Sequence, residues 1–90
     1  MSTTNDILYG LSQYENIADP KLQRIAQQAK ALTENFNNGS LDADEYGELL
    51  QDLETQTRIL EGASDLAAQK QLNTIVNAAI TIAAIAAKAI

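Results

Sequence analysis

The chain has 90 residues, which is enough for one domain near the lower limit for a self-sufficient core. It contains no cysteine and no histidine, so it lacks disulfides, thiolate chemistry and the commonest general base and metal ligand. The net charge of −6 is uneven, since residues 1–62 sum to −7 and residues 63–90 to +1. Nucleic-acid binding needs clustered Lys and Arg, so we expect no nucleic-acid partner.

Residues 1–19 give the weakest pattern in the chain. Ile7, Leu11, Tyr14 and Ala18 fall at steps of four, three and four, which is one face of a helix. Gly10 disfavours that helix. We predict either a short helix or an N-terminal arm that packs on a partner. The first residues lack the basic and apolar regions of a signal peptide, so we expect no export by that route.

The next helix is predicted to begin at Asp19-Pro20. Asp19 can cap the free backbone N–H groups, and proline at the first helical position has no N–H to leave unpaired. The helix is predicted to end at Asn37-Asn38-Gly39, because Asn and Gly tolerate the left-handed conformation of a C-terminal cap. Its apolar stripe follows heptad spacing and consists of Leu22, Ile25, Ala29, Leu32 and Phe36.

A further helix is predicted to begin after Asp42, with Glu45 completing a capping box three positions later. Because the connection at residues 37–42 is short, this helix and the previous one should form an antiparallel hairpin over residues 20–62. That pairing would bring Lys30 toward Glu48 and Asp52. The hairpin core combines the first stripe with the apolar face of the second helix, which contains Tyr46, Leu49, Leu50 and Leu53.

Residues 63–90 are predicted to form a long helix rich in alanine and isoleucine, which makes the predicted fold all-α. Gly62-Ala63-Ser64 either separates this helix from the preceding one or is a weak point in one helix from about residue 43 onward. No charge lies between Lys70 and Lys88, and a helix that is apolar over most of its circumference is buried on several sides. We predict that it forms the interface of a homo-oligomeric bundle through Leu72, Ile75, Val76, Ala79, Ile82, Ala83, Ala86 and Ile90.

The same C-terminal segment has a second interpretation, as the membrane-active part of a small holin- or toxin-like protein. A helix from Ile75 to Ile90 would be about 24 Å long, whereas the hydrocarbon core of a bilayer is about 30 Å thick. The segment also lacks the broad basic face and the anchoring Trp or Phe of an interfacial helix. We therefore favour packing against protein over membrane binding.

Two groups of acidic residues imitate functional sites. Asp42-x-Asp44-x-x-Gly47 resembles the start of a calcium loop, but Leu53 stands where the chelating glutamate is required. Catalytic carboxylates need a desolvated pocket and a partner, so we predict no enzyme activity, catalytic residue, metal or cofactor. The second group lies on a polar helix face that is either simply solvated or, in a third interpretation, binds a basic protein partner through Glu45, Glu48, Asp52 and Glu54.

The run from Leu32 to Tyr46, closing with Leu49-Leu50, resembles the short helical hairpins of SHOCT-like bacterial domains and of small bacteriophage virion proteins. The resemblance covers about residues 20–55 and consists largely of turn and capping chemistry. It implies an oligomerisation or assembly module without catalytic residues. We therefore predict a structural protein of a bacteriophage particle that associates with itself or with another structural protein, located in the virion or the bacterial cytoplasm.

Overall fold

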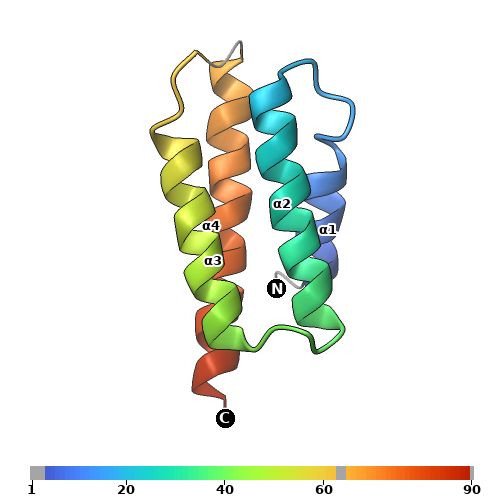
Figure 1. Ribbon diagram of the computed structural model, residues 1–90, viewed down its shortest axis with the longest axis vertical. Coiled ribbons are helices and arrows are strands. Elements are labelled where there is room, and N and C mark those ends of the chain that lie inside the picture. The colour runs from blue at the N-terminus through green and yellow to red at the C-terminus, as the bar shows by residue number, and fades with distance from the viewer. Residues whose placement is uncertain (1–3, 63–64, 90) are drawn as a thin grey trace.

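The computed structural model describes residues 4–62 and 65–89, and in these ranges the chain is all-α with no strand, as predicted. Four helices run alternately up and down the molecule, with the last one reaching furthest toward the lower end of the view (Figure 1). They form an elongated bundle with principal extents of 41 × 23 × 22 Å. The helices are α1 (Thr4–Ser12), α2 (Pro20–Asn37), α3 (Ala43–Arg58) and α4 (Leu66–Lys88).

The predicted helix starts of the hairpin are confirmed at atomic detail. The Asp19 carboxylate accepts hydrogen bonds from the backbone N–H groups of Lys21 at 2.9 Å and Leu22 at 3.4 Å. At the start of α3, the Asp42 carboxylate accepts from Glu45 N at 2.8 Å, and the Glu45 carboxylate accepts from Asp42 N at 3.3 Å. These caps satisfy donors that a helix leaves free, so local sequence chemistry sets where α2 and α3 begin.

The core is shared by all four helices, and it includes most of the predicted hairpin core. Six of those residues are buried, namely Leu22, Ile25, Ala29, Tyr46, Leu50 and Leu53, and Leu32 and Phe36 pack half-buried at its edge. Leu49 differs from the prediction, because 40% of its surface is exposed. Leu49 precedes the buried Leu50 by one residue, so it is rotated about 100° around α3 and points outward from the core.

Residues 43–90 were predicted to form either one helix or two, and the structure has two. α3 ends at Arg58, and Gly62 then adopts a left-handed φ of +77° in the connection. Asp65 caps the start of α4, where its carboxylate accepts from Ala68 N at 3.0 Å. The chain reverses at this connection, so α4 packs antiparallel along α3, as Figure 1 shows.

The N-terminal segment folds as a short helix that covers part of α2 and α4. Ile7 and Leu11 of α1 are buried, and Tyr14 behind the helix is buried as well. The Tyr14 hydroxyl donates a hydrogen bond to the Ala68 carbonyl at 3.3 Å. Burial, and secondarily the charge of Asp65, raises the pKa of Tyr14, because both disfavour a phenolate at this place.

The predicted approach of Lys30 to Glu48 and Asp52 is wrong. The Lys30 ammonium instead forms an ion pair with the Glu15 carboxylate in the loop between α1 and α2. The hydrogen bond to Glu15 raises the pKa of Lys30. The path of that loop could not be predicted from sequence patterns. The loop places the Glu15 carboxylate against the Lys30 ammonium.

Two aromatic rings and a threonine join the lower ends of α2 and α3. Phe36 and Tyr46 stack with ring centroids 4.5 Å apart and an interplanar angle of 11°. The Thr33 hydroxyl donates to the Ala29 carbonyl at 2.8 Å, and it shares a hydrogen bond of 2.7 Å with the Tyr46 hydroxyl. Burial raises the pKa of Tyr46, whereas its hydrogen bond with Thr33 acts in the opposite direction.

This buried phenol predicts a loss of stability in alkali. Above pH 10 the folded chain retains the Tyr46 proton that the unfolded chain releases, so the free energy of unfolding falls as the pH rises. Urea titrations from pH 8 to 11 should show this fall, and Tyr46→Phe should reduce it. Tyr9→Phe, at an exposed ring, is the matched control and should follow the parent. Equal alkaline losses in all three proteins would contradict the assignment.

Gly39 provides a test of the turn between α2 and α3. Its φ is +86°, in the left-handed region, and a Cβ built on it meets nothing within 4 Å, so a substitution there is opposed by backbone conformation alone. Gly39→Val should lower the free energy of unfolding by about 1–2 kcal/mol. Gly39→Asn should recover most of this, because Asn tolerates that region. Thermal melts that do not separate the two variants would show that the turn is different.

Candidate functional site

The α4 helix carries the predicted oligomer interface, and the structure covers much of it within a single copy of the chain. Leu72, Val76, Ala79 and Ala83 are buried against the other helices of the bundle. Of the remaining interface residues, Ile75, Ile82 and Ala86 are half-buried, and Ile90 lies outside the described residues. Association through α4 therefore remains a prediction, and the surface on which it depends is narrower than the sequence indicated.

One uncovered apolar part of α4 lies near its C-terminal end. Ile85 is 63% exposed, and Ala84 and Ala89 beside it are exposed too. Gly47, near the start of α3, lies opposite Ala83. Because α3 begins four residues before Gly47, its first residue lies about one turn further along α4 than Ala83. Figure 1 shows the end of α4 extending past the turn that joins α2 and α3. We call this end, residues 82–89, the α4 tip.

Small residues bring α3 and α4 together next to the α4 tip. A Cβ built on Gly47 would lie 3.5 Å from the Cβ of Ala83, which is ordinary van der Waals contact. Beside this contact lies a shallow, open depression of about 370 Å³, with Asp44 and Glu48 at its edge. Its apolar lining includes Ala43, Gly47, Ile80, Ala83, Ala84 and Ala87. The depression is a surface feature of the α3–α4 contact, and it gathers no set of catalytic groups.

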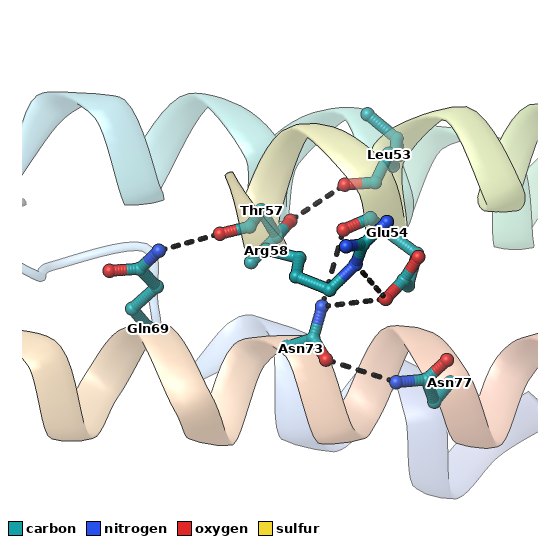
Figure 2. A network of polar contacts seen from close by, with 7 residues as sticks. All are labelled: Leu53, Glu54, Thr57, Arg58, Gln69, Asn73 and Asn77. Carbon is teal, nitrogen blue, oxygen red and sulfur yellow. Dashed lines mark hydrogen bonds and ion pairs between the residues drawn. The ribbon is translucent and has the colours of Figure 1, made fainter. Parts of the chain in front are cut away.

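Polar side chains hold the other half of the α3–α4 contact. The Gln69 side-chain amide donates to the carbonyls of Thr57 at 2.6 Å and Leu60 at 3.3 Å. The Thr57 carbonyl lies in the last turn of α3, where a helix leaves its C=O groups without intrahelical donors, and the Leu60 carbonyl follows just after the helix. The first of these bonds is drawn in Figure 2. Gln69 thus caps the end of α3 from the neighbouring helix.

One turn further along α4, Asn73 repeats this contact. Its amide donates to the Glu54 carbonyl at 3.2 Å and to the Glu54 carboxylate at 3.4 Å. Arg58 pairs with the same carboxylate at 3.4 Å, and Asn77 donates to the Asn73 side-chain oxygen at 3.0 Å. Figure 2 shows these groups as one chain of contacts between the two helices. Because Gln69 and Asn73 each reach a particular position on or just after α3, these contacts favour one register of α4 on α3.

Of the four acidic residues considered for a basic partner, Glu45, Glu48 and Asp52 are exposed on α3. Glu54 is half-buried and engaged by Asn73 and Arg58, whereas Glu45 belongs to the capping box of α3. Asp42, the first acid of the calcium-like run, is also used as a cap. No group of three or more acidic side chains in residues 4–62 and 65–89 is arranged to hold a metal ion.

The sequence alone does not indicate the contacts that Gln69 and Asn73 make with α3. Their signal is the spacing of Gln69, Asn73 and Asn77, which places three amides on successive turns of one helix. That spacing marks a polar seam, but it does not reveal that the seam faces the carbonyls of α3.

No protein-family model, curated protein or solved structure matches this chain. The resemblance to SHOCT-like hairpins and small virion proteins stays a prediction from the sequence. Among the helices that the structure describes, none combines the length and apolar character needed to cross a membrane.

The amide contacts of α4 can be tested with a pair of matched substitutions. Gln69→Met preserves the size of the side chain but leaves the Thr57 and Leu60 carbonyls without their donor, which should lower the free energy of unfolding by about 1–3 kcal/mol. Gln71→Met, on the exposed side of the same helix, should change it by less than about 0.5 kcal/mol. Urea denaturation of the two variants would contradict the role of Gln69 if they were equally stable.

Proposed function

We propose that this protein is a structural assembly component that acts by association rather than by catalysis, and that its copies associate through the α4 tip. The observation that supports the proposal is the exposure of Ile85, of which 63% remains uncovered at the end of the charge-free part of α4. Isolated exposed apolar residues are common on protein surfaces. Ile85 differs because two of its four neighbours one turn away, Ile82 and Ala89, are apolar as well, and the other two are Thr81 and Lys88.

The composition of the α4 tip suits helix-to-helix contact. Alanines at Ala84 and Ala89 allow a second backbone to approach closely, and Ile85 supplies the side chain to be buried. The end of α4 extends below the turn that joins α2 and α3 (Figure 1), so a second copy reaches this end without meeting α2. We infer a symmetric contact in which the tips of two copies pack side by side, since two-fold association is the commonest arrangement of soluble oligomers.

The wider setting of the proposal is a bacteriophage particle. It is supported by the resemblance of residues 20–55 to the hairpins of small virion proteins, and by a small, acidic, helical chain with an apolar end. In such a particle the bundle would serve as a repeated unit or as an adaptor between other structural proteins.

The proposal predicts that association depends on Ile85. Ile85→Gln should weaken self-association by about tenfold or more, because it places a polar group where apolar surface would be buried. Leu66→Gln is the matched control: Leu66 lies in the same helix and is 68% exposed, but at the opposite end. Sedimentation equilibrium over a range of concentrations gives the dissociation constants. A parent chain that stays monomeric at millimolar concentration would exclude the proposal, as would equal effects of the two variants.

A further inference from the structure

A second apolar surface lies between α2 and α3, on the face of the bundle away from α1. It consists of two adjoining depressions of about 470 and 380 Å³ that share Gln56 as a lining residue. Leu49 and Ile59 stand on this surface with 40% and 62% of their areas exposed. We call it the α2–α3 groove, and its apolar lining residues are Ile25, Leu32, Leu49, Leu53, Ile59 and Leu60.

The charges of the groove are separated along its length. Lys21, Arg24 and Glu61 line one depression, whose net charge is therefore positive, and Asp52 of α3 lines the other. Within the part of the chain that the structure describes, neither Arg24 nor Asp52 takes part in an ion pair. One end of the groove is therefore basic, and the other is acidic.

The middle of the groove is polar and neutral. Gln28 and Gln56 lie there, and each side-chain amide offers both a donor and an acceptor. The pairing of the helices confirms their central position: Lys21 reaches the Glu61 carbonyl at 2.9 Å at one end, and Phe36 stacks on Tyr46 at the other. The sequence of groups along the groove is thus basic, neutral and acidic.

We propose that the α2–α3 groove binds the α2–α3 groove of a second copy, in antiparallel orientation about a two-fold axis near Gln28 and Gln56. A two-fold rotation about such an axis brings the basic end of each copy to the acidic end of the other. Arg24 of each copy then lies at the level of Asp52 of the other copy. A groove of one sign would repel its own copy, so the distribution of charge is what identifies a second copy as the occupant.

The size of the face agrees with this occupant. α2 has 18 residues and α3 has 16, so each is about 24–27 Å long, and two adjacent helices are about 20 Å wide. The face therefore covers on the order of 500 Å² in projection, and its accessible area is larger because side chains stand out from it. Stable dimers bury about 800 Å² on each partner, and weaker complexes bury less. The face is large enough for a dimer without any contribution from α4.

This inference extends the proposed self-association, but it uses a different surface. The groove belongs to α2, α3 and the residues that follow α3, whereas the α4 tip lies at the end of the last helix. A chain with two self-complementary surfaces assembles beyond a dimer. Loss of one surface should therefore leave a discrete dimer through the other, which allows the two contacts to be tested separately.

The test uses complementary charge reversals in the Ile85→Gln chain, which isolates the groove from the α4 tip. Arg24→Glu places Glu against Asp52 in both halves of the dimer, and Asp52→Arg places Arg against Arg24. Each variant alone should bind its own copy at least about tenfold more weakly than the Ile85→Gln chain. An equimolar mixture should recover the dimer, because every contact then pairs opposite charges. Size-exclusion chromatography with light scattering measures all three samples.

Controls separate this result from effects on folding. Glu34→Lys reverses an exposed charge of α2 that does not line the groove, and it should retain the dimer. Leu49→Gln should weaken the dimer without altering a charge. Far-ultraviolet circular dichroism should give the same melting temperature for the reversed-charge variants and the Ile85→Gln chain, since Arg24 and Asp52 are exposed.

Three outcomes would overturn the groove contact: an Ile85→Gln chain that is monomeric, charge reversals that leave its dimer unchanged, or reversed-charge monomers that fail to combine on mixing. Failure of the α4 tip gives a different result, because the Ile85→Gln chain would then have the same assembly size as the parent.

Discussion

The fold depends on how closely and in what register α4 lies along α3. At one end, Ala83 packs beside Gly47, where a Cβ would lie 3.5 Å from the Ala83 Cβ, in ordinary van der Waals contact. At the other end, Gln69 and Asn73 reach backbone carbonyls of α3. Close packing without polar groups would permit sliding by one helical turn, whereas the amides favour one alignment. The paired helices then present Leu72 and Val76 to α1 and α2, which complete the core.

Local chemistry explains why part of this fold could be predicted from the sequence. The Asp19 and Asp42 caps and the left-handed Gly39 act within four residues of their own positions, and all three are found where the sequence placed them. The placement of Lys30 was wrong because its partner, Glu15, depends on the path of a loop. Leu49 was assigned to the core because it lies at the edge of the apolar face of α3. Helical periodicity does not show which of the adjacent Leu49 and Leu50 is buried.

The candidate surfaces were predictable to a smaller extent. Periodicity indicates that a helix face is buried, but it does not identify what buries it. Val76 and Ala83 follow the same apolar pattern as Ile82 and Ala86, yet the first two are covered within the chain and the others are partly open. The α2–α3 groove could not be predicted from the sequence for a related reason. Arg24 and Asp52 are unremarkable exposed charges in the sequence, and their relation appears only once the two helices lie side by side.

The brevity of α1 has a consequence for how the bundle opens. A helix of nine residues is too short to be stable by itself in water, so α1 is stabilised by the burial of Ile7 and Leu11. It is also joined to the rest only through the segment before Pro20, so it can detach while α2, α3 and α4 stay packed. Amide exchange should therefore reach α1 first, through a local fluctuation of low energy. Detachment would expose the α4 surface around Ile75, which a neighbouring molecule's α1 could fill by exchange of identical segments.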